Sequence, residues 1–164
     1  MPAARVRICF VCLGNICRSP TAEGVMKRLV ADEGLAHVID VDSAGTAAYH
    51  VGERADKRSR QHAERRGISL DSRARQFVDR DFGSMDYVLA MDESNLEDLQ
   101  SLPGAADYDG HLVLFRTFDP IAPSGAEVPD PYYGGDRGFE EVLDLCEAAC
   151  RGLLGHVREH FDVS

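Results

Sequence analysis

Three cysteines, an arginine and a serine lie in one short run near the start of the chain, "CFVCLGNICRSPTAEG", residues 9–24. Cys12 and Arg18 in this run are separated by five residues, and Ser19 follows directly. These residue types suit three kinds of chemistry: a thiol nucleophile in an anion-binding loop, a disulfide, or half of a metal site. The residues between them and the surrounding elements distinguish the three.

The segment between the thiol and the guanidinium favours an anion-binding loop. Gly14 is able to take a positive φ angle and Asn15 tolerates one, so the backbone N–H groups are predicted to turn inward as an anion nest. Ser19 is suited to cap a helix and Pro20 to begin it, which directs the positive helix end at the same space. The planar guanidinium of Arg18 suits two oxygens of a phosphate-sized oxyanion. A thiolate at position 12 would then be a nucleophile beneath a bound phosphorus atom.

Alternating patterns predict the elements that position this loop. Short apolar runs favour strands, and apolar residues spaced three and four apart favour helices. The strands are predicted at 6–12, 37–45, 85–91 and 111–115, and helices near 21–33, 53–66, 92–102 and 139–157. This order predicts an α/β domain, residues 1–164, with a parallel sheet and helices on both faces. Ligands of such folds bind beyond the carboxyl ends of the strands, where Cys12 lies.

Length, charge and cysteine content limit the function classes. The 164 residues, 44% of them hydrophobic, suffice for one core, and the net charge of −10 argues against nucleic acids and membranes as partners. We interpret the locally basic stretch 54–75 as a solvated helix face, with a nucleic-acid-binding surface as the alternative. The five cysteines and the lack of a signal peptide favour reduced thiols in the cytoplasm; export without a signal peptide is compatible with the same sequence.

A thiolate that attacks a phosphate monoester needs a general acid to protonate the leaving oxygen. Asp119 and Asp130, each followed by proline in a Pro- and Gly-rich loop, compete for this role. Asp130 precedes Tyr132 and Tyr133, whose rings are suited to hold a phenyl group. Asp119 follows a strand directly and is suited to capping a turn. The residue types alone leave both aspartates open.

The run "VCLGNICRSP" resembles the signature of the bacterial low-molecular-weight protein tyrosine phosphatases: a cysteine, five residues, an arginine and a serine. The similarity extends over nearly the whole chain, through "DSAGT" (42–46), "ARQ" (74–76), "MDESNL" (91–96) and "DPYYG" (130–134). It implies a single α/β domain with a four-stranded parallel sheet in the order 2-1-3-4. It also implies hydrolysis of phosphotyrosine monoesters through a phosphocysteine intermediate, without a metal or cofactor.

The resemblance also implies roles for individual residues. Cys12 is the expected nucleophile, Arg18 binds the phosphate, and Asp130 is the general acid and then the base. The expected phosphate-binding loop comprises Leu13, Gly14, Asn15, Ile16, Cys17 and Ser19. The expected pocket lining comprises Tyr49, Tyr132 and Tyr133. Asp119 keeps the structural role of capping a turn.

The surroundings of the loop follow from the same resemblance. Asn15 and Ser43 match the pair that holds the loop in the family, and Ser72 stands beside them where the family usually has a histidine. The hydroxyl of Ser19 is placed to donate to the sulfur of Cys12. Cys17 is expected to guard Cys12 through a reversible disulfide.

Other activities stay open at this point. A thiol-dependent arsenate reductase would need further redox cysteines, and none lies between Cys17 and Cys146. Relatives that prefer phosphoarginine have threonine at the position of Ile16, so Ile16 favours phosphotyrosine. A "HVREH" pattern at 156–160 has too few residues after it for a third ligand, so no metal site is expected. The expected partners are tyrosine-phosphorylated proteins or peptides and inorganic phosphate, as product and inhibitor, and the chain is expected to be a monomer or weak dimer.

Overall fold

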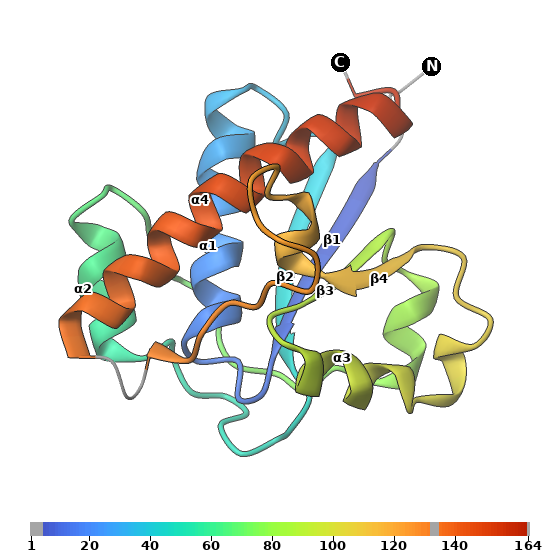
Figure 1. Ribbon diagram of the computed structural model, residues 1–164, viewed down its shortest axis with the longest axis horizontal. Coiled ribbons are helices and arrows are strands. Elements are labelled where there is room, and N and C mark those ends of the chain that lie inside the picture. The colour runs from blue at the N-terminus through green and yellow to red at the C-terminus, as the bar shows by residue number, and fades with distance from the viewer. Residues whose placement is uncertain (1–4, 132–134, 164) are drawn as a thin grey trace.

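A central parallel sheet organises the computed structural model, which describes residues 5–131 and 135–163 (Figure 1). The strands are β1 (Val6–Cys12), β2 (Ile39–Gly45), β3 (Tyr87–Ala90) and β4 (His111–Leu114). The helices are α1 (Arg18–Asp32), α2 (Lys57–Glu64), α3 (Glu93–Gln100) and α4 (Gly135–His160), with short 3₁₀ turns η1 (Asp79–Gly83), η2 (Pro103–Ala105) and η3 (Phe115–Phe118). All pairings are parallel in the order β2-β1-β3-β4, which confirms the predicted fold class.

Helices and turns cover both faces of the sheet, and β1 therefore buries side chains on each face. Ile8 and Phe10 belong to the core cluster that also contains the apolar faces of α1 and α4. Cys9 and Val11 belong to the opposite cluster, which contains residues of α3 and η1. A strand that is covered on two faces requires a nearly unbroken apolar run. This part of the sequence pattern was therefore sufficient to place β1 at the centre of the sheet.

The carboxyl ends of β1 and β2 meet where the functional loop begins. Cys12 is paired with Gly45 in the sheet register, and Thr46 N–H donates to the carbonyl oxygen of Cys12 at 2.9 Å. A Cβ atom at Gly45 would lie 2.7 Å from the carbonyl oxygen of Leu13, so a larger residue would push the loop away. The loop after β1 is therefore held against the end of β2 by backbone contacts.

Strand β1 matches its predicted range, whereas several helix starts differ; α1, for example, begins at Arg18 and not near residue 21. The helix predicted from Glu53 begins at Lys57, because the side chain of Asp56 accepts from two backbone N–H groups of its first turn. Helix α4 begins at Gly135, earlier than the predicted Phe139, so the loop predicted at 119–138 is shorter. No helix in the described part of the chain is long and apolar enough to cross a membrane.

The arginine-rich stretch 54–75 is only partly the solvated helix face that we predicted. Arg75 lies half-buried between Asp42 and Asp81, at 2.9 and 3.0 Å. Arg66 donates to carboxylates of α4 and is also half-buried. The prediction is wrong for these two residues, since their charge is used to join elements that are far apart in the sequence.

Candidate active site

A pocket of about 360 Å³ opens at the carboxyl end of β1. It is lined by Cys12, Leu13, Gly14, Ile16, Cys17, Arg18, Tyr49, His50 and Asp130. The predicted nucleophile, guanidinium and acid thus meet in one cavity, although they come from opposite ends of the chain. His50 is an additional lining residue that the sequence analysis did not identify. Tyr132 and Tyr133 lie outside the described residues.

The sulfur of Cys12 lies among hydrogen-bond donors. Its Sγ is 3.0 Å from the hydroxyl of Ser19 and 3.3 Å from the backbone N–H of Asn15. Ser19 was also predicted to be the helix N-cap, and this is wrong: α1 begins at Arg18, with Cys17 at the cap position. The hydroxyl of Ser19 is thereby directed at the sulfur, where a donor stabilises a thiolate.

Asn15 holds the loop in its turn. Its φ angle is 58°, in the left-handed region that asparagine was expected to tolerate, whereas Gly14 does not adopt the positive φ that it is able to take. Nδ2 of Asn15 donates to Ser19 at 2.7 Å and to Ser43 at 2.9 Å. Oδ1 accepts from the backbone N–H of Arg75 at 3.0 Å, which fixes the amide orientation. Because Asn15 donates to the hydroxyl of Ser19, the hydroxyl proton of Ser19 is left for an acceptor, which is either the sulfur of Cys12 at 3.0 Å or the carbonyl oxygen of Ala44 at 3.4 Å.

Ser72 takes part in this network through a buried carboxylate. Its hydroxyl donates to Oε1 of Glu23 at 2.8 Å, and the hydroxyl of Ser43 donates to the same oxygen. Lys27 reaches the other oxygen at 2.6 Å. A carboxylate only accepts, so Glu23 makes Ser43 a donor toward it and an acceptor from Asn15. The sequence analysis missed Glu23 because no local motif joins it to Ser43 and Ser72, which are 20 and 49 residues away.

The guanidinium of Arg18 is buried and anchored on one side. Its Nη1 donates to Oδ2 of Asp92 at 2.7 Å and to the carbonyl oxygen of Val128 at 3.1 Å. Burial lowers the pKa of Arg18, but the hydrogen bond that Arg18 donates to Asp92 and the neighbouring acidic groups outweigh it, so the pKa is above its usual value. Asp92 also caps α3 by accepting from Asn95 N–H at 2.8 Å, so α3 fixes the anchor. The other groups of Arg18 line the pocket as a permanent positive charge.

The cysteines differ in their surroundings, and all five are free thiols. Burial and the charge of Asp56 raise the pKa of Cys17 to about 12. Cys9, Cys146 and Cys150 are fully buried in the core, and burial raises their pKa well above the usual range. Thiols of this kind pack as small apolar side chains.

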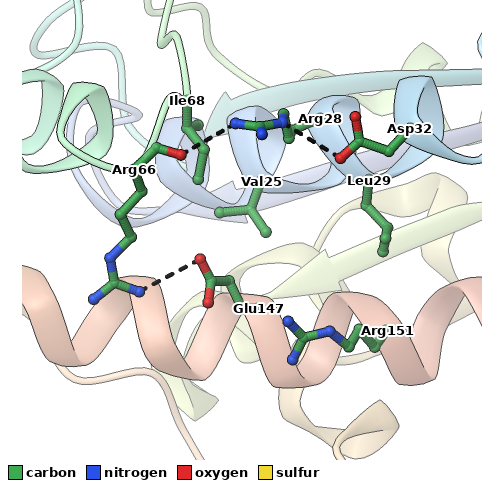
Figure 2. A pocket seen from close by; sticks show the side chains of 8 residues that line it. All are labelled: Val25, Arg28, Leu29, Asp32, Arg66, Ile68, Glu147 and Arg151. Atoms are coloured by element: carbon green, nitrogen blue, oxygen red, sulfur yellow. Dashed lines mark hydrogen bonds and ion pairs between the residues drawn. The ribbon is translucent and has the colours of Figure 1, made fainter.

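A second groove, between α1 and α4, has a different lining. This groove of about 240 Å³ holds Val25 and Leu29 opposite Glu147, as Figure 2 shows. Two of its three arginines, Arg28 and Arg66, bind backbone carbonyls and carboxylates, and no thiol lines it. Across residues 5–131 and 135–163, no three histidine, cysteine or acidic side chains are placed to share a metal ion.

The structure is an α/β protein with a pocket at the carboxyl end of β1. In this pocket a thiol, an arginine and a helix N-terminus surround a space of the size of an oxyanion. The family model described as "Low molecular weight phosphotyrosine protein phosphatase" matches residues 7–163. The chain belongs to this family, which confirms the resemblance inferred from the loop signature, and it is a protein-tyrosine-phosphatase. A low molecular weight protein-tyrosine-phosphatase from Streptomyces coelicolor is 46% identical over 157 residues, which cover 95% of this chain and 96% of that protein.

Solved structures agree with this assignment. A protein tyrosine phosphatase from Entamoeba histolytica has a TM-score of 0.85 and 41% identity, over 94% of this chain and 97% of its own. The Drosophila arginine phosphatase DARP has a TM-score of 0.81 and 31% identity, over 92% of this chain and 97% of its own. The fold is therefore shared by phosphatases that are named for different phosphorylated residues.

Proposed function

We propose that this chain hydrolyses phosphotyrosine monoesters through a phosphocysteine on Cys12, with Arg18 binding the phosphate and Asp130 acting as acid and then base. The observation that carries the proposal is the common pocket of these three residues, with the hydroxyl of Ser19 3.0 Å from the sulfur. We treat residues 1–164 as one phosphatase domain. Arg18 and the amino end of α1 supply the positive charge at the phosphate, so the proposed reaction uses no metal or cofactor.

In the first step the Cys12 thiolate attacks phosphorus, an S–P bond forms, and the P–O bond to the phenolic oxygen breaks. Asp130 gives its proton to that oxygen, so a neutral phenol leaves. In the second step Asp130 takes a proton from water, the water oxygen attacks phosphorus, and the S–P bond breaks to release inorganic phosphate. Ser19 and the backbone N–H of Asn15 stabilise the thiolate that is regenerated.

The rim of the pocket supports an aromatic substrate. Tyr49 is 76% exposed and Leu13 47% exposed, and both line the cavity that contains Cys12. Their apolar surfaces are available to the ring of a phosphotyrosine, together with Ile16 at the loop. The arsenate reductase alternative lacks a further redox thiol here, because Cys9, Cys146 and Cys150 are buried in the core.

A substrate panel tests this assignment. We expect kcat/KM on a phosphotyrosine peptide to exceed that on matched phosphoserine and phosphoarginine peptides by at least about 10-fold, because only the phenyl ring fills the apolar rim. The reaction is followed by phosphate release without added metal, and arsenate reduction with a thiol reductant is measured alongside. A preference for phosphoarginine, or arsenate turnover without phosphatase activity, would favour the corresponding alternative.

We propose that Cys17 protects Cys12 from irreversible oxidation. Peroxide converts the Cys12 thiolate to a sulfenic acid, and condensation with the Cys17 thiol gives a disulfide and water. Both sulfurs line the same pocket. Burial raises the pKa of Cys17 to about 12, so its thiol is protonated at neutral pH and reacts slowly with peroxide itself.

Replacing Cys17 with serine is therefore expected to change recovery from oxidation. After a short peroxide treatment, the unmodified enzyme should regain most of its activity with dithiothreitol and Cys17→Ser little, since its sulfenic acid oxidises further. Cys146→Ser, the same exchange in the core, should recover like the unmodified enzyme. Equal recovery of all three proteins would contradict a guarding role.

The remaining proposals concern partners and compartment. Phosphorylated proteins are the substrates that the family implies, and we propose tyrosine-phosphorylated proteins or peptides among them. Inorganic phosphate is the proposed product and inhibitor, since it occupies the same loop. The net charge of −10 supports the absence of nucleic-acid and membrane partners, and the free thiols support a cytoplasmic location. A monomer or weak dimer is the proposed assembly.

A further inference from the structure

Helix α2 connects the loop of the nucleophile to the helix that follows the acid. At its beginning, the backbone N–H of Asp56 donates to the carbonyl oxygen of Ile16 at 2.7 Å, within the loop that carries Cys12. Helix α2 packs against the amino-terminal part of α4, as Figure 1 shows. Helix α4 begins shortly after Asp130. A side chain of α2 that contacts α4 would therefore influence the position of Asp130 relative to Cys12.

His62 of α2 is such a side chain. It is buried, with 4% of its surface exposed, and its ring stacks on Phe139 with an interplanar angle of 9° and centroids 5.5 Å apart. Nδ1 is hydrogen-bonded to the carboxylate of Glu140, and Nε2 lies 3.4 Å from Oδ1 of Asp136. One imidazole thus contacts three residues near the start of α4. An imidazole donates to both carboxylates only when each nitrogen carries a proton.

An arginine reinforces the same contact. Arg66 donates to Glu140 at 2.8 Å and to Asp144 at 2.9 Å, and it lies 3.4 Å from Glu147 (Figure 2). The hydrogen bond that Arg66 donates lowers the pKa of Glu140, and burial of the carboxyl raises it. The hydrogen bond with His62 lowers it further, so the pKa of Glu140 lies below its usual value. Glu140 therefore stays ionised at neutral pH and keeps both partners.

The start of α4 is packed directly on the acid loop. A Cβ atom at Gly138 would lie 3.2 Å from the carbonyl oxygen of Pro131 and 3.4 Å from its Cα, so this helix turn and the backbone of Pro131 are in close contact. Pro131 is buried and follows Asp130 in the chain. A shift of the first turns of α4 would be transmitted to Pro131, because interiors are close-packed and the contact leaves no free space.

We propose that His62 is a positioning residue for the general acid: by holding Phe139, Glu140 and Asp136 it fixes the start of α4, and through Pro131 it fixes Asp130 above Cys12. This inference rests on the proposed role of Asp130. His62 touches neither the substrate nor the sulfur. Its removal is therefore expected to impair proton transfer and to leave the thiolate unchanged.

The test compares aryl phosphates whose leaving groups differ in basicity. For His62→Ala we expect kcat/KM on phenyl phosphate to fall about 10-fold, because a small displacement of a catalytic group has effects of this size. On 2,4-dinitrophenyl phosphate, whose leaving group needs no acid, the fall should be less than about 2-fold. The rate of Cys12 alkylation by iodoacetate should not change. His37→Ala, at an exposed histidine, is the matched control and should behave as the unmodified enzyme on both substrates.

Two further variants keep the proposal testable. His62→Gln retains a donor toward Glu140 and should recover most of the lost activity; it also serves if the alanine variant does not fold. In a double-mutant cycle, His62→Ala should cause no additional leaving-group-dependent loss once Asp130 is alanine. Equal losses on both substrates, slower alkylation, or additive effects in the cycle would overturn the proposal. If Asp130→Ala alone lowers kcat/KM equally on both aryl phosphates, the assignment of Asp130 as the general acid fails. This result is distinct from a failure of the proposed role of His62.

Discussion

Replacing Cys12 with serine is expected to abolish turnover of phosphotyrosine peptides, lowering kcat by roughly 10⁴-fold or more. A hydroxyl in this position is not ionised at neutral pH, and the loop contains no base that would take its proton. The hydroxyl of Ser19 lies 3.0 Å from the sulfur position, but a neutral alcohol is too weak a base to take that proton. The measurement is steady-state phosphate release, together with a search for the phosphocysteine in acid-quenched enzyme.

The serine variant should still bind the oxyanion, since Arg18 and the backbone of the loop are unchanged. Its affinity for inorganic phosphate, measured by titration calorimetry, should therefore stay close to that of the unmodified enzyme. Cys146→Ser, the same exchange in the core of α4, should keep full activity. Normal turnover by Cys12→Ser would refute the assignment of the nucleophile.

The second large effect is expected for Asp130→Ala. Without the acid, the phenolic oxygen leaves as an anion, so kcat/KM on phenyl phosphate should fall by about 10³-fold, whereas that on 2,4-dinitrophenyl phosphate should fall by less than about 10-fold. The slope of log kcat/KM against the pKa of the leaving group should become steeper. A series of substituted phenyl phosphates measures this slope directly.

The other aspartate of the loop provides the matched control. Asp119 is buried, and its Oδ1 accepts from the backbone N–H of Ile121 at 3.1 Å, so it caps a turn as predicted. Asp119→Asn keeps an acceptor there and should leave the leaving-group slope unchanged. If Asp119→Asn steepens the slope and Asp130→Ala does not, the two aspartates have been assigned in the wrong order.

The sheet could be predicted from sequence because its signal is local. Strand β1 was predicted with its observed limits, since seven residues that are almost all apolar leave little choice for a strand buried on two faces. The helix starts were less accurate. Serine and proline at Ser19 and Pro20 gave a good capping signal, yet the hydroxyl of Ser19 is used at the sulfur instead of at the helix end.

Part of the support of the site could not be predicted, because it depends on side chains that meet only in the folded chain. Glu23 lies on a helix where an acidic residue would ordinarily be solvated, and only the fold places Ser43 and Ser72 beside its carboxylate. His62 gave no signal for a similar reason: its partners Asp136 and Glu140 follow it by 74 and 78 residues. Residue types and spacing indicated Cys12 and Arg18, and the family resemblance added Asp130, Asn15 and Ser43. Neither signal indicated Glu23 or His62.

The order of the elements along the chain determines when the parts of the site and of the core become available during synthesis on the ribosome. Strand β1 precedes the other strands in the chain, but its neighbour β3 begins only at Tyr87, and Asp130, the proposed acid, follows later still. A nascent chain that has exposed Cys12 but not Asp130 is therefore expected to lack the complete proposed site. Helix α4, which packs with α1 in one core, follows all four strands, so this core closes only after α4 has been synthesised.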